Sequence, residues 1–132
     1  MDDNLRGATS AAEAFDRLLA GRESPWTAVG NFLDSFYTAD PPGRVALVAT
    51  PPAAAADDAA LRWAAFLAAS TDWLAYRFGM ERPDWVLRPE YVLLEPWFLY
   101  PEGALRISSL FLTPPPFKAR NIFCGDNALD RV

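Results

Sequence analysis

The stretch that most constrains the fold is residues 57–79, which are rich in alanine and contain no proline. Alanine has the highest intrinsic helix propensity, so this stretch predicts a long helix. Asp57 is a suitable N-cap, and Gly79 stands where a left-handed C-cap is wanted. Helical spacing predicts one apolar stripe, formed by Trp63, Phe66, Leu67, Leu74 and Phe78. Other apolar residues lie off that stripe, so we expect this helix to be packed on two sides and to be the most buried element.

Shorter helices are predicted before this stretch from their capping residues. Each begins at a serine, threonine or aspartate that can cap a helix, and two of the caps are followed by proline, which favours the first helical position. The candidate caps are Thr9 or Ser10, Ser24 and Asp40. Residues 43–49 could also form a strand, but the aspartate and prolines before them favour a short helix. Residues 1–8 are expected to be frayed.

The last third of the chain has a different character. Seven of the twelve prolines lie between Pro83 and Pro116, interleaved with aromatic residues. Long helices do not tolerate proline at such intervals, so residues 81–132 predict an extended wrap over a helical core. Within the wrap, residues 102–112 read as one helix. The predicted fold is therefore mainly α: a compact single-domain helical bundle over residues 1–132 around one central helix, with an irregular C-terminal third that is rich in proline and aromatic residues.

The charge and the cysteine content limit which compartment and which classes of partner suit the chain. The net charge of −5 disfavours a general binder of nucleic acid or of anionic membranes, which would normally be basic. The single cysteine, Cys124, leaves no internal disulfide, as is usual in a reducing compartment. The start of the chain does not read as a secretory signal. The uninterrupted apolar run in the central stretch is too short to cross a bilayer. These features predict a soluble cytoplasmic protein with no membrane partner.

Few residues are suited to catalysis. The chain has no histidine, one cysteine and only scattered glycines, so we assign no catalytic residue, no cofactor site and no metal site. Glu90 and Glu95 could in principle form an acid–base pair or hold a divalent ion. Charged residues beside prolines on a surface loop are the commoner explanation of these two glutamates. We therefore expect a protein without enzymatic activity.

Two aromatic clusters are candidate binding surfaces. Trp97, Phe98 and Tyr100 fall within four residues, and such a cluster either anchors the segment in the protein's own core, the commoner case, or binds a partner. Lys118 and Arg120 stand among phenylalanines and could contact phosphate. Two positive charges on an acidic chain are a weak footprint, so a packed C-terminal turn is favoured there. Binding of nucleic acid is not expected.

A series of landmarks in the last third resembles a known family. The series runs from P-x-W at residues 83–85 and P-W-F at 96–98, through T-P-P-P-F-K-A-R-N-I-F at 113–123, to A-L-D-R-V at 128–132. It is similar to the C-terminal domain of actinobacterial-type proteins in which that domain often follows a helix-turn-helix of the XRE regulator type. The likeness extends over roughly residues 40–132. The matching residues are Phe117, Arg120, Asn121, Ile122, Phe123, Leu129 and Arg131.

The resemblance implies a bacterial antitoxin context, because such genes look like the antitoxin or regulatory halves of toxin–antitoxin-like pairs. We therefore expect a non-enzymatic antitoxin-like protein that binds and neutralises an effector (toxin) protein from the neighbouring gene. A homo-oligomer is compatible with this expectation. One alternative is a transcriptional regulator or nucleic-acid-associated accessory subunit, although no convincing helix-turn-helix is found in the first two predicted helices. A second alternative is a small metal-dependent enzyme that uses Glu90 and Glu95.

Overall fold

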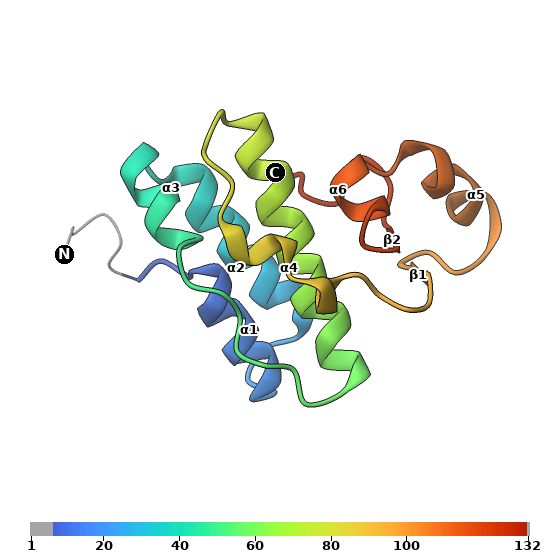
Figure 1. The fold of residues 1–132 in the computed structure, drawn as a ribbon, viewed down its shortest axis with the longest axis horizontal. Helices are drawn as coiled ribbons and strands as arrows, with labels where there is room; N and C mark the ends of the chain where they lie inside the picture. Colours follow the sequence, from blue (N-terminus) through green and yellow to red (C-terminus); the bar gives the residue numbers. More distant parts are fainter. Residues whose placement is uncertain (1–6, 132) are drawn as a thin grey trace. The chain divides into compact units, whose positions relative to one another are not determined.

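Helices make up most of the chain, and the strands within residues 7–131 are two short ones (Figure 1). The structure is a computed structural model, and it describes residues 7–131 of the 132-residue chain. The prediction of a mainly α fold is confirmed. In chain order the elements are α1 (Ala11–Leu19), α2 (Pro25–Thr38), α3 (Pro41–Leu47), α4 (Asp58–Arg77), the 3-10 helices η2 (Asp84–Leu87) and η3 (Pro89–Tyr91), β1 (Trp97–Phe98), α5 (Gly103–Leu112), α6 (Pro115–Lys118) and β2 (Ile122–Phe123).

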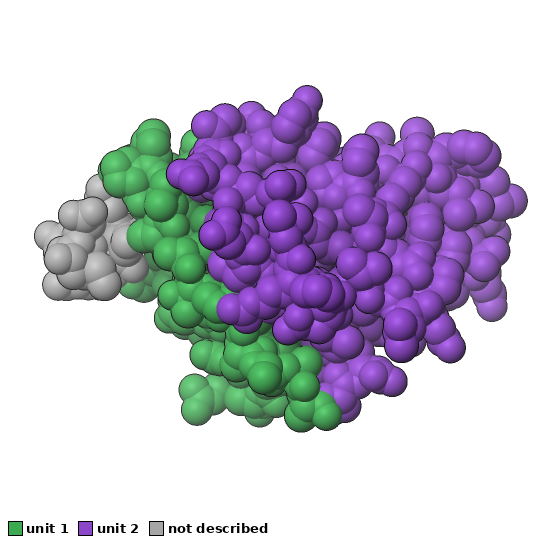
Figure 2. All heavy atoms as spheres, viewed as in Figure 1, with its two compact units in different colours: residues 1–56, 131 green, residues 57–130, 132 purple. Residues whose placement is uncertain are grey.

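The chain divides into two compact units, which Figure 2 shows in green and purple. Unit 1 contains α1, α2 and α3 together with Arg131, and unit 2 runs from Asp57 to Asp130. The assignment of residues 1–132 to a single domain stays a prediction. The predicted fraying of residues 1–8 falls mostly on residues 1–6, which lie outside the described residues.

The predicted caps open the helices of unit 1. Ser10 caps α1 and forms a capping box with Glu13: each side chain accepts a hydrogen bond of 3.1 Å from the other residue's backbone N–H. Ser24 caps α2, and Asp40 caps α3 by accepting a 2.9 Å hydrogen bond from the N–H of Gly43. Three of the first N–H groups, which helix geometry leaves unpaired, are satisfied in this way. The predicted starts of all three helices are confirmed.

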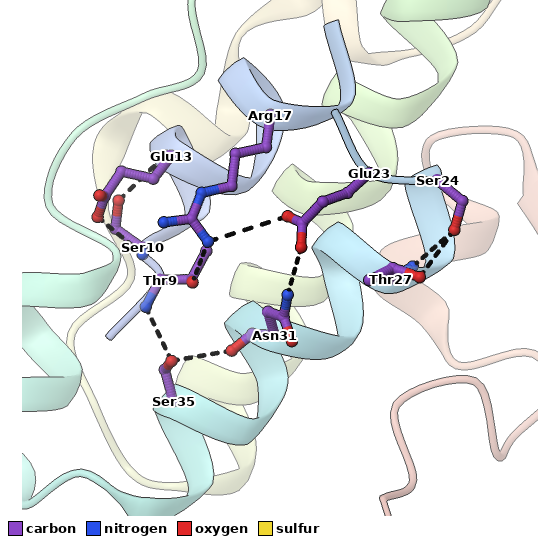
Figure 3. Close-up of polar contacts among 9 residues, drawn as sticks. All are labelled: Thr9, Ser10, Glu13, Arg17, Glu23, Ser24, Thr27, Asn31 and Ser35. Carbon is purple, nitrogen blue, oxygen red and sulfur yellow. Dashed lines mark hydrogen bonds and ion pairs between the residues drawn. The ribbon is translucent and has the colours of Figure 1, made fainter. Parts of the chain in front are cut away.

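A polar network joins α1 to α2 beside their apolar contact (Figure 3). The Thr9 N–H donates to Ser35 Oγ at 2.9 Å, and Arg17 donates to Thr9 Oγ1 at 2.9 Å. Asn31 donates to Glu23 Oε2 at 2.8 Å, while Arg17 and Glu23 form a longer ion pair of 3.9 Å. The apolar contact is buried on both helices and includes Ala11, Ala14, Phe15, Phe32, Leu33 and Phe36. Unit 1 therefore combines a small aromatic core with hydrogen bonds at its edge.

Arg131 belongs to unit 1, and its guanidinium lies against α2. Its Nε donates to Asp34 Oδ1 at 2.8 Å and its Nη2 to Asp34 Oδ2 at 3.1 Å, the two-pronged geometry that suits arginine and carboxylate. This hydrogen bonding lowers the pKa of Asp34. A Cβ atom at Gly30 would stand 2.9 Å from Arg131 Nη2. The glycine in the middle of α2 therefore makes room for the arginine.

The first element of unit 2, α4, has the ends that the sequence predicts. Asp57 accepts a 2.8 Å hydrogen bond from the N–H of Ala60. At the other end Gly79 has a φ of 63°, and the N–H of Met80 donates to the carbonyl of Ala75 at 2.8 Å. With the bond from Gly79 N–H to the Tyr76 carbonyl, this is a Schellman motif. A glycine fits here because left-handed backbone strains residues that carry a Cβ.

The burial of α4 agrees with the prediction in its middle and departs from it at its end. Eleven of its 20 residues are buried, more than in any other described element, and six of these are alanines. Phe66, Leu67 and Leu74 are buried as expected. The predicted stripe is wrong at Phe78, which is 37% exposed because it caps the helix after the last packed turn. Tyr76 is also exposed, and it stacks on Trp73.

The rest of unit 2 surrounds one side of α4 with short elements. The two 3-10 helices and α6 pack against α4, and β1 pairs with β2 in parallel. Trp97 stands opposite Ile122 and Phe98 opposite Phe123, with a 2.8 Å hydrogen bond from Trp97 N–H to the Asn121 carbonyl. The sequence predicted an extended wrap over residues 81–132 but not this pairing. Two residues are too few for the alternating pattern that identifies a strand.

Candidate functional site

The predicted aromatic cluster consists of two half-buried residues, Trp97 and Phe98, and one exposed residue, Tyr100. The Trp97 ring packs edge-on against Trp63, with ring centres 5.0 Å apart, and against Phe66 at 6.3 Å. Edge-to-face packing at these distances is favourable beyond the burial of ring surface. Trp97 is half-buried, so much of its ring anchors β1 to α4. This is the core-anchoring role that the sequence left open for it.

Phe98 is half-buried like Trp97, whereas Tyr100 is exposed. Phe98 stacks on Phe123 with ring centres 4.8 Å apart, and the guanidinium of Arg106 lies 4.2 Å from the Phe98 ring centre. Such a cation–π contact strengthens when it is shielded from water. Tyr100 is 41% exposed. Partner binding by these three residues stays a prediction, and Tyr100 is the most accessible of them.

The residues that carry the family likeness lie mostly inside unit 2. Phe117 is buried, and its ring centre lies 5.4 Å from that of Phe66 on α4. Asn121 has a φ of 67°, a left-handed conformation that asparagine tolerates better than most residues. Its side chain donates a 3.0 Å hydrogen bond to the carbonyl of Leu93, which joins α6 and β2 to the segment after η3. The motif therefore has a visible structural role within this unit.

Arg120 is the most heavily bonded member of that motif. Its Nη1 donates to the Pro116 carbonyl at 2.7 Å, and its Nη2 donates to the Val86 carbonyl at 2.8 Å and to Asp72 Oδ2 at 3.0 Å. The residue is only 4% exposed. A buried charge is tolerated when it is paired and hydrogen-bonded, and here one guanidinium connects α4, η2 and α6. The sequence suggested phosphate contact for this arginine, but its bonds are internal.

Thr113 is a central polar residue that the sequence did not reveal. Its hydroxyl donates to the Ser109 carbonyl at 2.6 Å and accepts hydrogen bonds from the N–H groups of Cys124 at 3.1 Å and Gly125 at 2.8 Å. The buried side chain thus ties the end of α5 to the residues after β2. Burial of Cys124 raises the pKa of its thiol to about 12, which makes the thiolate scarce at neutral pH.

The helix α5 exposes an apolar face. Only Ser109 is buried in this ten-residue helix. At 3.6 residues per turn, Ile107 with Phe111 and Leu105 with Leu112 form two apolar pairs on one side of the helix, with Ser108 between them. The exposed fractions of these four side chains run from 52% to 75%. Figure 1 shows α5 apart from α4, with α6 and the strands between them. The sequence predicted this helix but gave no sign that its apolar side chains would be exposed.

Of the two glutamates of the enzyme alternative, Glu95 lines a hollow that does not include Glu90. Glu95 lines an open hollow of about 190 Å³ together with Asp58 and Arg62, whereas Glu90 is exposed elsewhere on the surface. Within residues 7–131, no group of three or more cysteine, aspartate or glutamate side chains is arranged to hold a metal ion. In the same residues, no helix combines the length and the apolar character of a membrane span.

Lys118, the second basic residue of the predicted phosphate contact, is the last residue of α6. Its ammonium donates to the Phe111 carbonyl at 3.4 Å.

Comparison of the chain with protein-family models, with curated proteins and with solved structures finds no match.

Proposed function

We propose that this chain is a non-enzymatic, antitoxin-like module that binds and neutralises an effector protein from the neighbouring gene. The observation that carries the proposal is the apolar face of α5, formed by Leu105, Ile107, Phe111 and Leu112. Contiguous exposed apolar residues of this kind mark surfaces that other proteins cover. The resemblance in the last third supports the antitoxin context.

Burial of this face by a partner is favourable in free energy. Burial of apolar surface contributes roughly 25 cal/mol per Å², and large side chains at the centre of an interface supply most of the binding free energy. Phe111 is 75% exposed and Ile107 is 61% exposed, so each has much apolar surface still to bury. These two side chains are the proposed anchors, and Tyr100, three residues before α5, is a further exposed aromatic side chain.

The partner surface is proposed to be an apolar groove with basic residues at its rim. The chain has 17 acidic and 12 basic residues, so it attracts a basic partner over a distance. Such attraction mainly speeds the encounter and falls with ionic strength, whereas the apolar contacts on α5 set the lifetime of the complex.

Co-expression with the neighbouring gene tests the proposal. The neighbour is expected to be toxic alone, to be rescued by this chain and to co-purify with it. Replacing both anchors, Ile107→Glu with Phe111→Glu, is expected to weaken binding at least about 30-fold because charge would enter an apolar interface. Val45→Glu is the matched control, since Val45 is 57% exposed on α3.

Two results would contradict the proposal in different ways. A neighbour that is harmless and does not co-purify removes the antitoxin function. A complex that the double variant and the control weaken equally removes α5 as the interface. Circular dichroism of each variant separates loss of binding from loss of fold.

A further inference from the structure

A second hollow in unit 2 has a charge opposite to that of the whole chain. It lies where the end of α4, η2 and α6 meet, and its volume is about 220 Å³. Arg82, Arg88 and Arg120 line it, with Asp72 as the acidic group among the lining residues. A chain with a net charge of −5 therefore has here a small concave surface with an excess of guanidinium groups.

The acidic group in this hollow is already engaged by its buried neighbour. Asp72 Oδ2 accepts the 3.0 Å hydrogen bond from Arg120, while the distance from Asp72 Oδ1 to Arg82 Nη1 is 3.5 Å. The Arg82 side chain is 49% exposed, whereas that of Arg120 is 5% exposed. Arg120 is thus held at the inner wall, and Arg82 is the more exposed cation.

The remaining wall divides into a charged part and an apolar part. Arg88 is exposed at the mouth, and Leu87 and Val92 supply apolar surface, 56% and 53% exposed. Guanidinium groups suit the two oxygen atoms of a carboxylate, and branched side chains suit a branched hydrocarbon.

We propose that this hollow binds a carboxylate carried on a small branched apolar group. Arg82 and Arg88 contact the carboxylate oxygen atoms, and Leu87 and Val92 contact the apolar part. Asp72 limits the affinity by competing for Arg82. The site is separate from α5 and does not depend on the proposed function.

Titration of the ¹⁵N-labelled protein with isovalerate, followed by NMR, tests the site. Amide shifts are expected at residues 82–92 and 119–120, and the uncharged analogue isovaleramide is expected to cause none. Arg82→Gln removes a charge-assisted contact and is expected to weaken binding about tenfold, whereas Asp72→Asn removes the competing carboxylate and should strengthen it. Arg77→Gln, also exposed but outside the hollow, should change nothing.

Three results would overturn the assignment. One is the absence of saturable shifts at these residues. Another is equal weakening by Arg82→Gln and Arg77→Gln, which would indicate general attraction of anions. The third is tighter binding of inorganic phosphate than of isovalerate, which would remove the apolar part of the site. If Asp72→Asn fails to fold, the comparison of Arg82→Gln with Arg77→Gln decides alone.

Discussion

The helices α4 and α5 are both rich in apolar residues, yet their surroundings differ. In α4 the buried residues are largely alanines, with Phe66, Leu67 and Leu74 among them. In α5 the large side chains are exposed, and the only buried residue is a serine. The alanines let η2, η3 and α6 approach α4 closely. Composition therefore identifies both helices, but the size of the side chains that face a neighbour separates the buried helix from the exposed one.

Phenylalanine truncation gives the largest expected difference between these helices. Phe66 is fully buried among Trp63, Trp97 and Phe117, so Phe66→Ala is expected to lower the free energy of unfolding by about 3–5 kcal/mol. Phe111 is 75% exposed, and Phe111→Ala is expected to change the free energy of unfolding by no more than about 0.5 kcal/mol. Urea denaturation of the isolated protein measures both. Equal losses would show that α5 is packed in solution.

The next largest effect on stability is expected at Thr113, whose hydroxyl attaches the end of α5 to the residues after β2. Thr113→Val keeps the shape of the side chain but removes the acceptor of the Cys124 and Gly125 N–H groups. Leaving buried donors unpaired is expected to cost about 1–3 kcal/mol. Thr113→Ser retains the hydroxyl and serves as the control in the same urea experiment. If valine is tolerated as well as serine, the hydroxyl does not hold the end of this helix.

The smallest expected effect is the contribution of Cys124 to the pH dependence of the free energy of unfolding. The pKa of Cys124 is raised by burial from 9.0 to about 12, so the folded chain holds the thiol proton more firmly than the unfolded chain. This contribution to stability is fully present below about pH 9 and is lost as the pH rises toward 12. Between about pH 8 and about pH 10 the wild type is expected to lose roughly 1 kcal/mol more than Cys124→Ala. Parallel pH profiles of the two proteins would contradict a protonated buried thiol.

Local chemistry made much of the fold predictable from the sequence. Serine or aspartate followed by proline is a common helix start, so Ser24 and Asp40 identified α2 and α3. The glycine end of α4 follows from the same kind of rule, as Gly79 shows. The pairing of Trp97 with Ile122 could not be predicted, because it joins short segments that are distant in the sequence.

The candidate sites were less predictable, because exposure is a tertiary property. Trp97 and Phe111 are both aromatic residues in the proline-rich third, and nothing local shows that the first packs on α4 while the second is exposed. The hollow lined by Arg82, Arg88 and Arg120 also assembles residues from separate segments. Basic residues of a single segment, such as Lys118 and Arg120, therefore gave an incomplete indication of where positive charge gathers.

The close approach of Arg131 to Gly30 has a consequence for engineering. Replacing a glycine inside a helix by alanine is a standard stabilising substitution, with a gain of up to about 1 kcal/mol. At position 30 the new methyl group would require the guanidinium to shift and would weaken its surface ion pair with Asp34, which is of comparable or smaller value. The two effects offset each other. A stabilising design must therefore treat positions 30 and 131 as one choice, for example by shortening the arginine when alanine is introduced.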